Sequence, residues 1–217
     1  MFKLIAAPTL FLSVPLLLSV FTSGQKTTEH NLFENSTDIG NTLKGSTVFD
    51  ASTGEYRVTG GGADMWGAED DLHFSWVRLS GDLTLTADVS FPSDGGAIPL
   101  KKGVLMVRQS LDSNSAYVDI AIHGDGHVTP QYRRVQGGET TDTMLSKTGS
   151  TRLRIERRGE QFTASAGPAD GNLTASAPIT VMLHDPVYVG IGMCAHKSDG
   201  VETAIFSNVL LKRVATK

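Results

Sequence analysis

The segment LTLTADVSF at residues 83–91 alternates apolar and polar side chains along its whole length. Leu83, Leu85, Ala87, Val89 and Phe91 occupy one set of positions, and polar residues occupy the positions between them. Successive side chains of a β-strand point to opposite faces of the sheet, so a period of two predicts a strand that is buried on one face. This pattern sets the expectation for the rest of the chain.

Short runs of the same kind recur before and after this segment, separated by Gly, Asp, Asn and Ser. No long window shows the 3.6-residue period of a helix. About twelve short strands with turn signals between them predict an all-β, two-sheet antiparallel β-sandwich. The expected strands lie near residues 46–51, 55–59, 72–79, 82–91, 103–110, 116–123, 127–134, 139–145, 151–158, 161–167, 175–183, 187–196 and 203–213, of which one of the weaker is expected to be absent.

The N-terminus differs from the rest of the chain. Lys3 precedes an apolar run from Leu4 to about Val20, and the small residues Thr22 to Gly24 follow. This order predicts a secretory signal peptide over residues 1–24, with an uncleaved membrane anchor as the alternative. Residues 25–40 are polar and are expected to form a lead-in to a single domain over 41–217. The predicted location is therefore secreted or periplasmic, without membrane contact after cleavage.

Composition excludes several classes of protein. The chain has 217 residues, a net charge of −4 and one cysteine, Cys194. A single cysteine cannot form an internal disulfide, and its apolar surroundings in sequence predict a buried thiol. The basic pairs 101–102, 133–134 and 157–158 are short and separated, so they are expected at solvated turns and strand edges. We therefore expect no nucleic-acid partner.

Residues 54–82 begin a pattern that extends through most of the chain. It starts with TGGGADMWGAEDDLHFSW, which is followed by LSGDLTLTADV. It continues later in the chain with GVLMVRQSLD, AYVDIAIHGDG, QYRR, VYVGIGMCAHK and TAIFSNVLL. This order resembles secreted concanavalin A-like domains of a family without an assigned reaction. Such domains stand alone, accompany glycoside hydrolases or follow TolB-type propellers. The resemblance covers about residues 40–213 and implies a jelly roll with one concave face on which sugars bind in related proteins.

The candidate ligand-binding residues combine flat aromatic rings with planar polar groups, as sugar recognition requires. Asp64, Gln131 and Arg133 are further polar candidates, and Trp76 a further aromatic one. The alternatives are that both tryptophans fill the core and that Asp64 caps the glycine-rich turn or pairs with a buried arginine such as Arg108. The residues assigned to the site are Trp66, Arg108, Tyr117, Asp119 and Tyr132.

Catalytic motifs are not found. Glu-x-Asp-x-x-Glu, which would place carboxylates on one face of a strand, is absent, as is a Gly-x-Ser-x-Gly elbow. Glu69–Asp71 are expected in a solvated acidic turn, with Ca²⁺ coordination as an alternative. His123 and His127 have hairpin spacing rather than the spacing of a helical zinc pair. His196 is expected as a satisfied loop histidine, with a position at the rim of a site as the alternative. We expect no catalytic residue, metal site or cofactor.

Three functions remain open at this point. The first is an exported, non-catalytic carbohydrate-binding module with a glycan or polysaccharide as its partner. The second is a glycoside hydrolase or related sugar-active enzyme whose carboxylates come from separate strands. The third is a cell-envelope protein-interaction module. All three are compatible with one fold, so the choice between them depends on the site.

Overall fold

The computed structural model describes Met1 and residues 30–92, 98–146 and 149–214. In these residues the chain forms strands, turns and bends but no helix, so none can span a membrane. The signal-peptide segment and the start of the lead-in lie outside the described residues.

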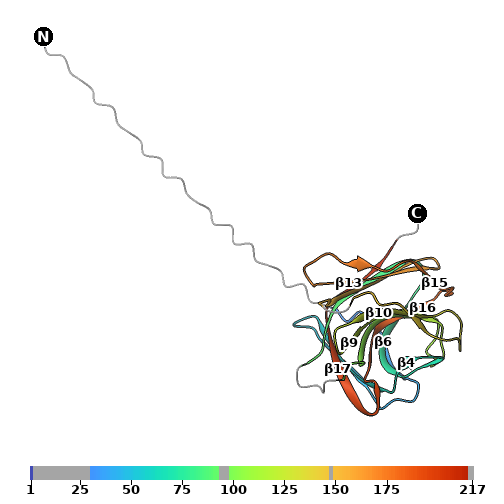
Figure 1. Cartoon of the computed structure of the whole chain (residues 1–217). Coiled ribbons are helices and arrows are strands. Elements are labelled where there is room, and N and C mark those ends of the chain that lie inside the picture. Colours follow the sequence, from blue (N-terminus) through green and yellow to red (C-terminus); the bar gives the residue numbers. More distant parts are fainter. Residues whose placement is uncertain (2–29, 93–97, 147–148, 215–217) are drawn as a thin grey trace.

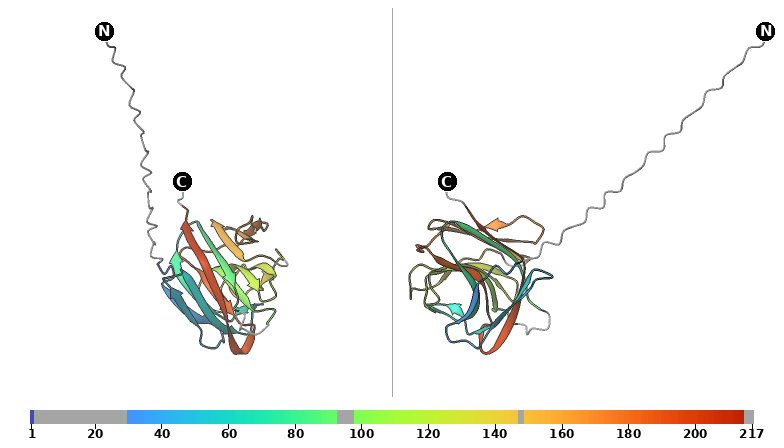
Figure 2. Two further views of the ribbon diagram at one scale, coloured as in Figure 1. Left: turned by 90° about the vertical axis from the view of Figure 1, so that its left-hand side faces the viewer. Right: turned by 180° about the vertical axis from the view of Figure 1, so that it is seen from behind.

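Two antiparallel sheets lie face to face (Figure 1), as the sequence predicts. The first is seven-stranded, in the order β1 (Asn35–Ile39), β6 (Leu72–Leu79), β16 (Val187–Cys194), β8 (Lys102–Arg108), β9 (Tyr117–His123), β10 (Val128–Arg133) and β11 (Thr141–Asp142). The second is eight-stranded: β14 (Thr174–Ala175), β13 (Gln161–Gly167), β12 (Arg152–Arg158), β7 (Leu83–Ser90), β17 (Lys197–Arg213), β3 (Glu55–Gly62) and β2 (Ser46–Asp50), with β15 (Ile179–Thr180) also on β13. In Figure 2, β17 runs in red along the second sheet.

Most expected strands form close to their predicted bounds, and the differences have local causes. The strand expected at 139–145 shortens to β11, because Pro130 of β10 faces β11 and has no N–H to donate. The strand expected at 175–183 divides into β14 and β15 around Pro178. β1 pairs with β6, so the sandwich includes part of the expected lead-in and begins before residue 41.

The glycines at 60–62 do not form the expected bend but end strand β3. A Cβ at Gly60 would lie 2.2 Å from the carbonyl oxygen of Met193 in the facing sheet. Glycine here permits a close approach of two backbones.

The main core lies between the sheets and uses the alternating positions of their strands. Leu83, Leu85 and Ala87 of β7 belong to the same buried cluster as Val118 and Ile120 of β9. A second, smaller apolar cluster covers the opposite face of the seven-stranded sheet. Its members are Ile39, Met65, Leu72, Phe74, Val104, Met106, Tyr117, Ala121 and Cys194. We call this side of the sheet the outer face.

Cys194 belongs to the cluster on the outer face, which confirms the expected buried thiol. Its burial raises the pKa of the thiol to about 12. The thiolate is the reactive form, so we expect no reaction with a colorimetric disulfide reagent at pH 8 in the folded protein. One equivalent should react after unfolding in guanidinium. Rapid labelling of the native protein would contradict this placement of Cys194.

Candidate functional site

A small hairpin covers part of the outer face. It consists of β4 (Met65–Trp66) and β5 (Glu69–Asp70), which pair with each other between β3 and β6 in the chain. Met65 is fully buried in the apolar cluster of the outer face, whereas Trp66 is 45% exposed. The hairpin therefore buries one side against the sheet and presents its tryptophan to solvent.

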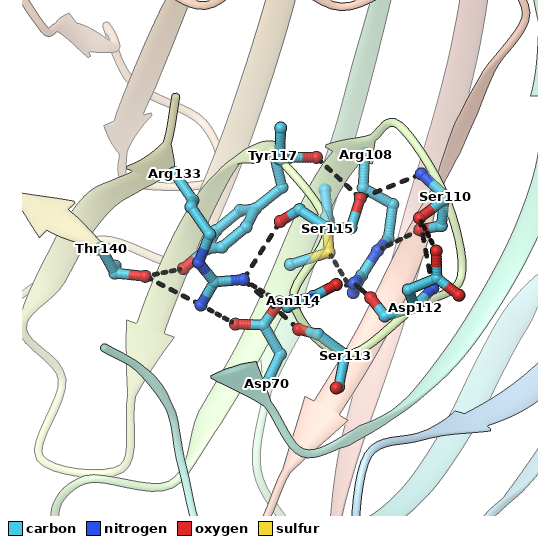
Figure 3. A network of polar contacts seen from close by, with 12 residues as sticks. Asp70, Arg108, Ser110, Asp112, Ser113, Asn114, Ser115, Tyr117, Arg133 and Thr140 are labelled. Atoms are coloured by element: carbon cyan, nitrogen blue, oxygen red, sulfur yellow. Dashed lines mark hydrogen bonds and ion pairs between the residues drawn. The ribbon is translucent and has the colours of Figure 1, made fainter. Parts of the chain in front are cut away.

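Asp70 fixes this hairpin to the sheet (Figure 3). Its carboxylate receives two hydrogen bonds from Arg133, at 2.9 and 2.8 Å, and forms an ion pair with Arg108 at 3.5 Å. All three side chains are fully buried. The sequence predicts a solvated turn at this position, and this prediction is wrong for Asp70, which is fully buried. Its carboxylate is bound by arginine rather than available to Ca²⁺.

Backbone carbonyls complete the partners of both arginines. Arg133 also donates to Gly67 O at 3.0 Å and to Ser115 O at 3.1 Å. Arg108 donates to Ser110 O at 2.7 Å and to Asp112 O at 2.6 Å. A buried ion pair is tolerated when further hydrogen bonds satisfy its remaining groups. This network is therefore structural: it seals the hairpin onto β8, β9 and β10.

A pocket of about 240 Å³ opens beside the hairpin. Its lining comes from the hairpin, from one end of strands β8 to β10, from β11 and from the segment after β16. The lining residues are Asp64, Trp66, Leu100, Lys102, His123, His127, Gln131, Asp142 and His196.

Asp64 and Lys102 form the main ion pair of this pocket. Lys102 Nζ donates to Asp64 Oδ1 at 2.7 Å and to Met65 O at 3.0 Å. Burial opposes ionisation of Asp64, but the charge and hydrogen bond of Lys102 outweigh it, so the pKa of Asp64 is lowered. His196 Nδ1 lies 3.5 Å from the same carboxylate oxygen. The partner of Asp64 is therefore Lys102, not Arg108.

Two histidine rings stack at the end of the β9–β10 hairpin. The centroids of His123 and His127 are 3.7 Å apart, with 15° between the ring planes. Burial, with the neighbouring His127, lowers the pKa of His123 to about 3, so its ring is neutral at physiological pH. His123 Nε2 lies 3.0 Å from Thr129 Oγ1, and His127 Nδ1 lies 2.5 Å from Asp125 Oδ1. The pair therefore offers a flat, stacked ring edge to the pocket.

Several buried polar atoms here have no hydrogen-bond partner among the described residues. They are both carboxyl oxygens of Asp119, Oε1 of Gln131, and Nδ1 of His123 and of His196. Asp119 and Gln131 are direct neighbours across β9 and β10. Burial raises the pKa of Asp119 well above its usual range. Unpartnered buried polar atoms are uncommon in native proteins, and ligand binding is one reason for them.

The structure separates the five predicted site residues. Trp66 lines the pocket, and Asp119 is fully buried next to its lining residue Gln131. Arg108 and Tyr117 are fully buried beside the hairpin anchor, so neither forms part of an open surface. Tyr132 packs against the main core and lines a different pocket.

Three residues of the pocket have other roles in the sequence-based prediction, namely Lys102, His123 and His127. Lys101 and Lys102 were expected in a solvated turn, but both are buried, and Lys101 pairs with Glu202 at 3.1 Å. The useful signal was alternation: Lys102 shares the parity of Val104 and Met106 and so belongs to the outer face. His196 lines the pocket, which agrees with the alternative of a rim position rather than with a satisfied loop histidine. Among the described residues, no group of three His, Cys, Asp or Glu is placed to hold a metal ion.

Comparison with solved structures supports the fold. A functionally unknown protein from Saccharomyces cerevisiae aligns with a TM-score of 0.60 and 17% identity, covering 79% of this chain and 93% of its own. The carbohydrate-binding module CBM66 from Bacillus subtilis aligns with a TM-score of 0.51 and 14% identity, covering 84% of this chain and 98% of its own. Arcelin-5, a lectin-like defense protein from Phaseolus vulgaris, aligns with a TM-score of 0.51 and 10% identity, covering 82% of this chain and 96% of its own.

No protein-family model matches the chain, and no curated protein matches it in sequence. At these identities the structural likenesses establish a jelly-roll β-sandwich fold and leave its function to the site.

Proposed function

We propose that this protein is an exported, non-catalytic carbohydrate-binding module whose site is the pocket beside the β4–β5 hairpin. The observation that carries the proposal is the exposed Trp66 at the edge of a pocket that contains unpartnered buried polar atoms. A sugar ring presents C–H groups that pack on an aromatic face and hydroxyls that pair with polar groups. The pocket offers both within one small volume.

Structural neighbours with related roles add support. Two of the neighbours above are described as a carbohydrate-binding module and a lectin-like protein. Export follows from the signal-like N-terminal segment of the sequence. Catalysis is not part of the proposal, because the sequence carries neither a Glu-x-Asp-x-x-Glu nor a Gly-x-Ser-x-Gly motif and the buried carboxylate of Asp70 is held by two arginines.

The test is a glycan array followed by calorimetry with the oligosaccharides that bind. We expect Trp66→Ala to weaken binding by about 30-fold, because truncating an aromatic residue that packs directly on the ligand costs about 2 kcal/mol. The matched control is Tyr132→Ala, which removes an aromatic residue from the other face of the same sheet and should leave affinity unchanged.

The same samples separate the proposal from its alternatives. Unchanged affinity of a folded Trp66→Ala variant would contradict the assignment of the pocket. Release of reducing ends from a bound polysaccharide would replace a binding module with a glycoside hydrolase. Failure to bind any glycan, together with specific capture of an envelope protein, would favour an interaction module.

A further inference from the structure

The pocket is rich in acceptors that lack a donor. Gln131 Oε1 and His123 Nδ1 belong to lining residues that are only 2% and 4% exposed, and neither atom has a partner in the described structure. When Nε2 of His123 donates to Thr129, its Nδ1 is an acceptor. Both oxygens of Asp119, next to Gln131, are also unpartnered. A ligand that fits this pocket must bring hydrogen-bond donors.

The charges of the pocket are also unbalanced. Asp64 and Asp142 line it together with a single lysine, Lys102, and no arginine among its described lining residues. Lys102 is already engaged by Asp64 and by the carbonyl of Met65. Asp125 adds a further carboxylate beside the lining residue His127. An anionic ligand group would find the lysine of this lining already paired and would face these acids.

The carboxyl of Asp119, next to the lining residue Gln131, can supply a further negative charge at this site when it ionises. Burial, together with the negative charge of Asp70, raises its pKa and favours the neutral carboxyl, although Lys102 and the backbone of Gln131 act in the opposite direction. A nearby positive charge favours the ionised form, and Lys102 already acts in that direction. A cationic group bound beside Gln131 would therefore lower the pKa of the Asp119 carboxyl and favour its ionised form.

Building on the proposed carbohydrate site, we propose that this pocket recognises an amino sugar through its protonated primary amine. An ammonium group supplies three donors from one atom, which suits neighbouring acceptors such as those of Gln131 and Asp119, which are direct partners across β9 and β10. Trp66 would pack against the sugar ring, and the amine would face Gln131 and Asp119. A hydrogen bond to a charged group contributes more than one between neutral groups. The amine is therefore preferred over a hydroxyl at this position.

The experiment compares four probes by calorimetry with the full-length mature protein at about pH 6, where an amine of this kind carries its proton. The probes are the β-1,4-linked trimers of glucosamine, of N-acetylglucosamine and of glucose, and propylamine alone. We expect the glucosamine trimer to bind at least about tenfold more tightly than the other two trimers. Propylamine should not compete, because it has no ring to pack on Trp66.

Asp119→Asn keeps the shape of the side chain but cannot ionise. It should reduce the preference for the glucosamine trimer to less than about threefold and leave the affinity for the glucose trimer unchanged. Asp170→Asn, on an exposed loop after β13, makes the same change in net charge and should alter neither value. Gln131→Leu removes an unpartnered acceptor without leaving a broken hydrogen bond, and should also weaken binding of the amine.

The outcomes separate this inference from the proposal on which it rests. Equal or weaker binding of the glucosamine trimer than of the glucose trimer overturns amine recognition and leaves sugar binding intact. Equal binding by propylamine shows that the site recognises an amine without a sugar. A uniform loss of affinity for all trimers in a folded Asp119→Asn variant would also overturn it. Binding of none of the probes overturns both proposals for this ligand class.

Discussion

Replacing Asp70 with asparagine is expected to destabilise the folded protein by about 3–5 kcal/mol. Asp70 is fully buried and forms the acidic centre between Arg133, at 2.8 Å, and Arg108, at 3.5 Å. Asparagine keeps the shape and one acceptor but removes the charge, so two buried guanidinium groups lose their counter-ion. The cost of leaving a buried charge uncompensated is much larger than the net stabilisation from an intact pair.

Thermal unfolding measures this effect, and the melting temperature should fall by about 6–20 °C in a domain of this size. Glu69→Gln is the control, because it removes one negative charge from the adjacent, exposed position of the same hairpin. Its effect should stay within about 0.5 kcal/mol. Equal stability of the two variants would show that Asp70 is not the anchor of the hairpin.

Gly190→Ala is expected to destabilise the protein by about 3 kcal/mol. Gly190 lies in β16, which pairs with β6 and β8 in the middle of the seven-stranded sheet. A Cβ there would lie 1.9 Å from Ser75 O and 2.9 Å from Trp76 Cα, both in the backbone of β6. Backbone atoms of a paired strand cannot move aside without breaking the ladder, so relief of this overlap would disrupt the sheet.

Urea unfolding compares this variant with Gly200→Ala. A Cβ at Gly200 would meet only the far end of the Lys197 side chain, at 2.2 Å from Cε, and that chain can rotate away. The second variant should therefore change the free energy of unfolding by less than about 1 kcal/mol. A Gly190→Ala protein as stable as the parent would contradict the spacing of β6 and β16.

Most of the fold could be predicted because the alternation of apolar and polar residues along a strand is a local property of the sequence. The pattern of 83–91 places Leu83 and Leu85 in the core, and β7 forms there as expected. The same rule also separates Tyr132 from Gln131 and Arg133, which lie one position away on β10 and so point to the opposite face. The sequence alone therefore places Tyr132 on the other face of the sheet from Gln131 and Arg133.

Other parts of the site depend on contacts that no local pattern records. Three acids follow one another at Glu69, Asp70 and Asp71, and only the fold shows that Asp70 turns toward Arg133, 63 residues later. Lys102 becomes a pocket residue because β8 lies beside β9, which is a matter of strand order. Sequence reasoning can assign a residue to a face, but it cannot tell which loop covers that face.

The Asp70 anchor also bears on how the sheet avoids misalignment. Arg133 faces Asp70, while its neighbour Tyr132 packs against the main core. A shift of β10 by one residue would exchange these faces and drive a guanidinium group into an apolar interior without a counter-ion. The carboxylate of Asp70 therefore favours the observed pairing of β9 with β10 over pairings that are shifted by one residue.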